Sequence, residues 1–368
     1  MIRVEPARLD EFLRVPSALY GAVPHWVPPL LAERRHALSK TPFVKRANIQ
    51  QWVARMGDRV VGRVSAQLDP LALELHPGVG HFGMLAAVDR PEVFSALMNT
   101  AAAWLRGNGA TIIRGPFDLS INEESGVLVD GFGTQPMMMM PHNPPYVGAR
   151  LEELGYAKAR DLLAYLHRAG EPLPEAAAKV MERPRPPGLT IRPLRMKRYG
   201  EEVKNLAAIF NDAWRDNWGF VPFTEADVAA MAREMRPLID PNLVWFAELQ
   251  GEPVAFLVCL PNVNEAIRDL GGRLLPLGWA KLLWRLKVSG LSTARVPLMG
   301  VRKALSRSMV GAMVPFLMIG ELRRAVLARG IRQVELSWVL EDNRAMRAVA
   351  EALCGPAYKT YRLYERAL

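Results

Sequence analysis

The sequence predicts an α/β (α+β) protein made of two tandem domains, each with a mixed central sheet flanked by helices. Three observations support this fold class. The chain has 368 residues, more than one typical domain needs. Half of its residues are hydrophobic, so both domains can form a core. The same order of elements (strand, helix, hairpin, strand, helix, strand, helix, strand) can be followed twice along the chain.

In the first half, periodicity and turn residues predict each element. Two alternating segments at 48–55 and 59–68, joined at Gly57-Asp58, predict a hairpin. Ala and Leu at spacings of three and four predict a helix at 91–106, which Gly107-Asn108-Gly109 ends. The other predicted elements are strands at 2–4, 80–88, 111–115 and 157–166 and helices at 9–20 and 145–154.

The second half repeats this order after a proline-rich segment, 171–187, which is typical of a linker. We therefore expect domains at 1–170 and 188–368. The predicted elements are strands at 189–192, 295–301 and 333–340, a hairpin at 243–260 that turns at Gln250-Gly251, helices at 199–214, 226–235, 316–328 and 344–353, and a closing segment at 358–364.

The formal net charge of +10 predicts an affinity for an anionic partner. Nucleic acid, an anionic membrane surface and coenzyme A all qualify, but no helix-turn-helix or RNP motif supports nucleic acid. Cys259 and Cys354 lie in apolar contexts, which indicates buried, reduced thiols. Without a signal peptide or a run of about eighteen apolar residues, the sequence predicts a cytoplasmic protein that could still contact the inner face of the membrane.

A basic loop follows the strand 295–301 and precedes an apolar helix. A helix start presents backbone N–H groups and the positive end of its dipole, which suits a pyrophosphate. A basic loop that merely caps an ordinary core helix is the competing interpretation, because short glycine motifs are weak signals. The candidate ligand-binding residues are Val301, Arg302, Ser306, Arg307, Ser308, Gly311, Ala312 and, after the next strand, Asn343.

This order of strand, basic loop, helix, strand and helix, with Asn343 and the closing Tyr358-Lys-Thr-Tyr-Arg-Leu-Tyr364, resembles the GNAT superfamily of acyl-CoA-dependent N-acyltransferases. The resemblance implies that the loop binds the pyrophosphate of coenzyme A and that pantetheine lies between two splayed strands. Acyl-CoA would then be a co-substrate, with no permanently bound cofactor. The family pattern Arg-x-x-Gly-x-Gly/Ala is degenerate, because Ser306 and Met309 replace its arginine and middle glycine.

The two halves are therefore expected to be GNAT-like domains with different tasks. In the first half, Asp89-Arg-Pro-Glu92 follows the corresponding strand, and proline with acidic residues does not suit an anion. The acyl-CoA side is thus expected in the second domain. The acceptor side is expected in the first domain, where a polar loop spans Gly115 to Gly126 and four methionines precede His142.

Polar residues in and after this loop offer general bases and hydrogen-bond donors. We expect Glu123 or Glu124 to be the base, with His142 as a rival, and Tyr146, Tyr358 or Tyr361 to protonate the leaving thiolate. Asp118, Asn122 and Asn143 are candidates for binding the acceptor. Alternatively, the asparagines are helix caps and His142 is a surface residue. No metal site is expected, because His-x-x-x-His and paired-cysteine spacings are absent from the sequence.

An insertion at 271–287 precedes the strand 295–301. Leu275, Trp279, Leu282, Leu283 and Leu286 fall on one helical stripe. With Trp284 and the basic Lys281 and Arg285, this pattern fits an interfacial helix on anionic lipid, a lid over an apolar substrate, or an ordinary helix packed on the core.

The whole chain also resembles a bacterial group of tandem GNAT-like proteins that includes ceramide synthases. The matching stretches are His25-Trp-Val-Pro-Pro29, Gly115 to Asn122, Asn211 to Pro222 and Glu335 to Asn343. The resemblance implies acyl-CoA-dependent transfer of an acyl group to a primary amine, with a sphingoid base as the narrower expectation. The alternatives are a non-catalytic GNAT-like binding protein and an aminoacyl-tRNA-dependent transferase.

Overall fold

The computed structural model describes residues 1–237 and 239–368, which form two compact units. The first unit contains Met1–Leu162, Ala266–Trp284 and Lys359–Leu368, and the second contains Leu163–Glu265 and Arg285–Tyr358. Each unit is a mixed sheet flanked by helices, so the predicted fold class is confirmed. The units differ from the expected domains, because Ala266–Trp284 and the end of the chain, Lys359–Leu368, belong to the first unit, and the first boundary follows Leu162.

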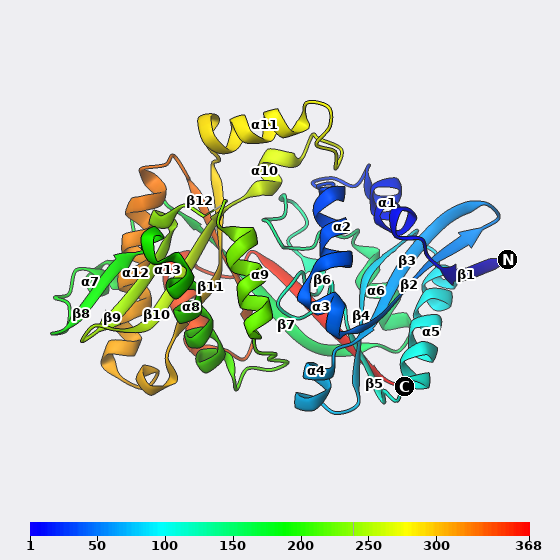
Figure 1. The fold of residues 1–368 in the computed structure, drawn as a ribbon, viewed down its shortest axis with the longest axis horizontal. Coiled ribbons are helices and arrows are strands. Elements are labelled where there is room, and N and C mark those ends of the chain that lie inside the picture. Colours follow the sequence, from blue (N-terminus) through cyan, green and yellow to red (C-terminus); the bar gives the residue numbers. More distant parts are fainter. Residues whose placement is uncertain (238) are drawn as a thin grey trace. The chain divides into compact units, whose positions relative to one another are not determined.

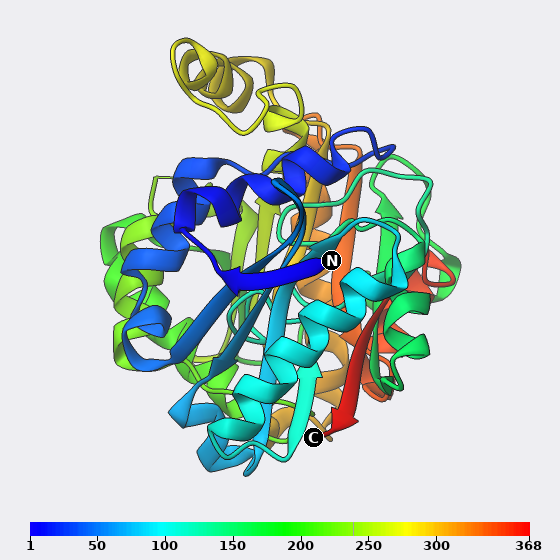
Figure 2. The same cartoon turned by 90° about the vertical axis from the view of Figure 1, so that its right-hand side faces the viewer.

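In the first unit, the strands pair in the order β1-β2-β3-β4-β5-β13, and β6 also pairs with β13. In this order the pair β4 and β5 is parallel, because helix α5 crosses over between the two strands. The apolar residues of α5 pack on the sheet (Figure 2, cyan). The elements are β1 (Ile2–Pro6), α1 (Leu9–Tyr20), α2 (Leu31–Lys40), α3 (Pro42–Arg46), β2 (Asn48–Met56), β3 (Arg59–Leu68), α4 (Pro70–Leu75), β4 (Val79–Ala87), α5 (Pro91–Gly107), β5 (Ile112–Gly115), β6 (Val127–Asp130), α6 (Tyr146–Glu153), α11 (Gly278–Trp284) and β13 (Lys359–Ala367). Strand β7 (Ala157–Arg168) and helix α10 (Val263–Ile267) each run from one unit into the other.

In the second unit, the strands pair in the order β12-β11-β10-β9-β8 (Figure 1). All pairs are antiparallel except β11 with β12, which α12 connects. The elements are α7 (Glu175–Met181), β8 (Leu189–Pro193), a 3-10 turn (Met196–Arg198), α8 (Tyr199–Trp214), α9 (Glu225–Met235), a 3-10 turn (Pro241–Leu243), β9 (Val244–Leu249), β10 (Glu252–Pro261), a π-helical turn (Arg285–Ser289), β11 (Thr293–Val301), a 3-10 turn (Lys303–Leu305), α12 (Met309–Leu327), β12 (Gln333–Leu340) and α13 (Arg344–Cys354).

Two local expectations are corrected by the structure. The segment 171–187 contains helix α7, whose Ala177 is buried in the same core as residues of α12, so this segment is packed rather than a free linker. Helix α12 begins at Met309 instead of residue 316, because the Ser308 side chain caps it by accepting from the Gly311 N–H. Pro315, one residue before the predicted start, lies inside the helix.

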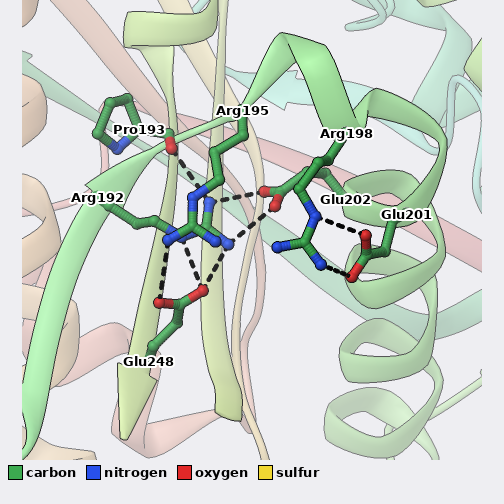
Figure 3. A network of polar contacts seen from close by, with 7 residues as sticks. All are labelled: Arg192, Pro193, Arg195, Arg198, Glu201, Glu202 and Glu248. Carbon is green, nitrogen blue, oxygen red and sulfur yellow. Dashed lines mark hydrogen bonds and ion pairs between the residues drawn. The ribbon is translucent and has the colours of Figure 1, made fainter. Parts of the chain in front are cut away.

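A charged cluster holds β8, β9 and α8 of the second unit together (Figure 3). The Arg192 guanidinium donates to Glu202 on α8 at 2.7 and 2.9 Å and to Glu248 on β9 at 2.7 Å. Burial disfavours the charge of Arg192, but both carboxylates outweigh this and raise its pKa. Arg198 and Glu201 form an exposed pair nearby.

Candidate active site

A pocket opens in the second unit where β11 and β12 stop pairing. The parallel register covers Thr293–Val296 on β11 and Gln333–Leu336 on β12, after which the strands continue to Val301 and Leu340. The lining residues come from both strands and from the ends of α8 and α13: Trp214, Asn217, Val296, Pro297, Met299, Leu336, Ser337, Trp338, Val339, Leu340, Asn343 and Met346. Two strands that diverge in this way expose unpaired backbone groups to a ligand.

A buried polar network lies at the point of divergence. Arg295 faces Glu335 in the register, and their side chains are 2% and 0% exposed. Arg295 Nε donates to Ser337 Oγ at 2.8 Å, and the Ser337 hydroxyl donates to Glu335. The other Glu335 oxygen accepts from the Tyr358 hydroxyl. A buried carboxyl group requires such partners, and Arg295, Ser337 and Tyr358 together compensate the burial of Glu335.

The predicted phosphate loop follows β11 directly. Two hydrogen bonds hold Arg302 against strand β10. Its backbone N–H donates to Val254 O, and its side-chain Nε donates to Pro253 O at 2.9 Å. Val301 and Ser308 are half-buried, whereas Ser306, Arg307 and Ala312 are exposed around the first turn of α12. Asn343 caps α13 by accepting from the Met346 N–H at 3.1 Å and also lines the pocket. The loop thus places basic and hydroxyl side chains at the start of a 19-residue helix.

Gly311 is the glycine that the structure most clearly requires in this loop. A Cβ at this position would lie 1.9 Å from the carbonyl oxygen of Leu305. We would expect from the sequence that Gly311→Asp weakens coenzyme binding while the fold survives. The structure adds that the change would also disturb the loop, because any side chain here meets the backbone of Leu305; the effect on coenzyme binding stays a prediction.

In the first unit, the polar loop brings the three predicted acidic residues together. Asp118 accepts from the Met84 N–H at 2.8 Å, its own N–H donates to Glu124 O, and the Glu124 carboxylate pairs with Arg34 of α2. Arg63 lies against the same cluster and donates to Phe12 O at 2.9 Å. The sequence did not point to Arg34 or Arg63, although Arg63 is a charged residue within the mostly apolar strand β3.

Burial controls the protonation of this cluster. It raises the pKa of Asp118, with Glu124 adding to the effect, and it lowers the pKa of Arg63 to about 10. The surrounding chain raises the pKa of Glu123 to about 7 against the opposing charge of Arg34. Glu123 is itself exposed, so water moderates this upward shift of its pKa.

The residues that follow the loop have mainly structural contacts. The Asn143 side chain accepts from the Leu128 N–H at 2.7 Å and donates to Leu128 O at 3.1 Å. It therefore fixes β6 and does not cap a helix. With both ends of its amide occupied in this way, Asn143 is poorly placed to bind an acceptor. Asn122 is half-buried, and its N–H donates to Ser120 Oγ. His142 Nε2 lies 3.0 Å from Pro24 O, and burial lowers the pKa of His142 to about 4, so it is neutral near pH 7.

The three candidate tyrosines lie in different environments. Tyr146 donates to Ala87 O at 2.8 Å, next to Tyr20, in the first unit. Tyr361 is fully buried in β13 of the same unit. Tyr358 is half-buried and bonded to Glu335 in the second unit. Of the three, Tyr358 belongs to the network beside the pocket, which makes it the strongest of the predicted proton donors.

The insertion forms a short helix, α11, with no buried residue, so the interpretation as an ordinary packed helix is wrong. Most of the exposed large apolar side chains of the described residues lie here: Leu275, Leu277, Trp279, Leu283, Trp284 and Val288. Lys281 pairs with Asp269 at 2.6 Å, and Arg285 is half-buried. Among residues 1–237 and 239–368, no helix is both long and apolar enough to cross a bilayer.

Similarity to known proteins agrees with this geometry. No family model matches the chain. It is 51% identical over 367 residues to the bacterial ceramide synthase of Caulobacter vibrioides, covering 99% of this chain and 96% of that protein. The chain belongs to the bacterial ceramide synthase family. A second relative, Protein YghO of Escherichia coli, is 47% identical over 361 residues and covers 97% and 92% of the two chains.

Solved structures show the same fold as this family member. A tandem GNAT protein from the clavulanic acid biosynthesis pathway covers 100% of this chain and 98% of its own, with a TM-score of 0.57 at 15% identity. A GCN5-related N-acetyltransferase from Sphaerobacter thermophilus covers 100% and 95%, with a TM-score of 0.54 at 13% identity. The chain is therefore a tandem GNAT-like N-acyltransferase, and the non-catalytic alternative is set aside.

Proposed function

We propose that this N-acyltransferase takes its acyl group from coenzyme A and transfers it to a sphingoid base. The observation that supports acyl-CoA most directly is the pocket between the diverging strands β11 and β12. Its wall combines the apolar Val296, Met299 and Leu336 with the diverging strand backbones, which suits an extended pantetheine arm with amide groups. The exposed Ser306 and Arg307, just before the N-cap of α12, would face the phosphates.

The acidic cluster of the first unit supports an amine as the acceptor. Asp118, Glu123 and Glu124 outnumber the two guanidinium groups beside them, so the loop attracts a cation. A protonated amine cannot attack a thioester and must first lose a proton. A carboxylate with a pKa near 7, as at Glu123, both accepts and releases a proton at neutral pH.

The exposed insertion supports a lipidic acceptor. Apolar side chains of α11 and the preceding loop face water, and the exposed Arg268 and Arg273 lie on the same segment. We propose that this segment contacts an anionic membrane surface, where a sphingoid base would be embedded. The relative from Caulobacter vibrioides is named a ceramide synthase, which agrees with a long-chain amine as the acceptor.

A thiol-release assay tests this function. The purified protein is incubated with acyl-CoAs of increasing chain length and with either a sphingoid base or a short soluble amine. We expect free thiol only when a long-chain amine is present, and calorimetry should show acyl-CoA binding without the amine. Absence of both binding and thiol release would contradict acyl-CoA dependence. Salt-sensitive tRNA binding with turnover of aminoacyl-tRNA would instead favour the tRNA-dependent alternative.

A further inference from the structure

An aromatic cluster lies at the end of α8 in the second unit. Phe210 and Trp214, one helical turn apart, stack with their ring centroids 4.7 Å apart. The loop that follows α8 adds Phe220 and Phe223, whose ring centroids lie 6.0 and 4.5 Å from that of Phe210. Phe256 of β10 packs on the cluster, with its ring centroid 6.1 Å from that of Trp214. Trp214 also lines the pocket between β11 and β12, so the cluster reaches the proposed site.

Hydrogen bonds on both sides of Trp214 fix the end of α8. The Asn211 side chain donates to Phe223 O at 3.1 Å and accepts from the Phe223 N–H at 3.0 Å, which holds the following loop against the helix. The next residue, Asp212, accepts from the Lys303 N–H at 2.8 Å, in the segment between β11 and α12. The position of Trp214 is therefore set by its neighbours in the chain and by the loop that would bind the phosphates.

A glycine of β11 makes room for the indole. A Cβ on Gly300 would lie 2.3 Å from Trp214 Cζ3 and 3.1 Å from Phe256 Cε1. Glycine at this position thus lets the ring edge lie directly on the strand. Since one edge of the indole meets β11 and one face stacks on Phe210, Trp214 is a large, fixed part of the pocket wall on the side of α8.

The two sides of the pocket differ in chemistry. The diverging strands offer backbone groups, which suit the amides of a pantetheine arm. Trp214 instead offers an aromatic ring backed by phenylalanines, and an indole has a single donor and no acceptor. Such a surface suits a hydrocarbon chain, which gains from leaving water and needs no hydrogen bonds.

We propose that Trp214 contacts a long hydrocarbon chain of a substrate and limits the chain length that the enzyme accepts, an inference that rests on the proposed acyl transfer. The acyl group and the sphingoid base both carry such a chain, and the experiment below distinguishes them. Each methylene group that the wall covers would raise kcat/KM about fourfold, until the chain meets the indole. Trp214 would select the substrate without taking part in bond making.

Trp214→Ala tests this inference in two series of reactions. Acyl-CoAs of increasing chain length are paired with one amine, and amines of increasing chain length are paired with one acyl-CoA. For chains longer than the wild-type optimum, we expect kcat/KM relative to that optimum to increase about tenfold or more in one series and to stay unchanged in the other. The series that responds identifies the substrate whose chain meets Trp214.

Trp245→Ala is the matched control. Trp245 is also a half-buried tryptophan of the second unit, but it lies on β9, where its indole N–H donates to Asn242 O at 3.0 Å. We expect this change to leave both chain-length profiles as in the wild type. If Trp214→Ala does not fold, Trp214→Phe decides, since it keeps a ring against Phe210 and should shift the same profile in the same direction by a smaller amount.

Gly300→Ala gives an independent reading of the same contact. The added methyl group must displace the indole, so we expect a changed chain-length profile in the series that responds to Trp214→Ala. The same change should have no further effect in a Trp214→Ala background, because the methyl group then has room. A Gly300→Ala effect that persists without the indole would contradict the inference.

The outcomes separate this inference from the proposed function. Release of thiol by a folded Trp214→Ala with wild-type profiles in both series would overturn the inference and leave acyl transfer intact. A uniform fall of kcat/KM at every chain length would overturn it as well, because it would indicate a general disturbance of the site. A wild-type protein that releases no thiol with any pair of substrates would end both proposals.

Discussion

Both terminal nitrogens of the Arg192 guanidinium donate hydrogen bonds to the carboxylate of Glu202, at 2.7 and 2.9 Å, inside the second unit. The side chains are 13% and 2% exposed. Such a pair gains little over apolar residues of similar size, but losing one partner leaves an uncompensated buried charge. Glu248 would lose the same arginine and keep only its longer contact with Arg195, at 3.5 Å.

Arg192→Met should therefore destabilise the protein by about 3–5 kcal/mol, measured as the free energy of unfolding in urea. Arg198→Met provides the control, since Arg198 and Glu201 are each more than half exposed and their pair should contribute at most about 1 kcal/mol. Equal effects of the two changes would show that the cluster does not depend on burial.

The helix α12 offers a second comparison within one element. Gly311→Ala places a Cβ against Leu305 O and should cost about 1–3 kcal/mol while weakening acyl-CoA binding. Gly320→Ala should stabilise the protein by about 0.5–1 kcal/mol, because its Cβ would only touch the flexible Met181 at 3.4 Å. Thermal unfolding and calorimetry with acyl-CoA would measure both. Normal binding by Gly311→Ala would mean that another loop holds the phosphates.

The raised pKa of Glu123 predicts a pH dependence. If Glu123 is the base, kcat should rise with pH and level off above about 7, where the carboxylate is ionised. Stability should follow the opposite course: the folded-state pKa exceeds the ordinary 4.5, so this contribution is present at low pH and is lost as pH rises through about 7.

Glu123→Gln should remove the rise in kcat, whereas Glu153→Gln, an exposed carboxylate of the same unit, should leave it unchanged. Glu124→Gln tests the other candidate base. Unlike Glu123→Gln, this change also removes the ion pair between Glu124 and Arg34. Near-normal turnover of Glu123→Gln and Glu124→Gln at saturating substrate would exclude both as the base.

Membrane contact through the insertion predicts that the protein sediments with anionic vesicles at low salt and is released by added salt. Reversing the charge of Lys281 would be a poor test, because Lys281 already pairs with Asp269. Reversing Arg268 and Arg273 to glutamate should reduce sedimentation, at about 1 kcal/mol for each charge. Leu277→Ser should also weaken binding, whereas Leu75→Ser, at an exposed leucine elsewhere in the first unit, should not. Wild-type protein that stays in the supernatant would exclude the contact.

The sequence predicted regular elements well wherever periodicity was strong. The bounds of α1, α8 and β12 agree with the prediction to the residue. The helices α3, α4 and α10, of five or six residues, were not predicted because so few residues give no periodic signal. Helix α2, of ten residues, was missed because it buries only Leu38 and has no apolar stripe. The start of α12 was predicted seven residues too late, because the Ser308 cap is recognised only from its contact with the Gly311 N–H.

The candidate site was predictable only in part, because its most buried groups interact across distant stretches of sequence. Glu335 and Ser337 stand two residues apart in an apolar strand, which places them on one face and could have drawn attention. Their partners Arg295 and Tyr358 lie 40 and 23 residues away from Glu335, and the parallel register of β11 and β12 brings Arg295 opposite. No local pattern gives that register in advance.

The return of the chain to the first unit through β13 has a consequence for biosynthesis. This strand pairs with β5 and β6, and the fully buried Lys359 donates to the carbonyl oxygens of Thr134 and Gln135. On the ribosome, β5 emerges some 240 residues before its partner, so the first unit waits with an open sheet edge while the second unit is made. The unit that is synthesised first is thus the unit that is completed last. Nascent chains that stop before Lys359 would expose the edge of β5, so we expect chaperones that shield strand edges to bind them.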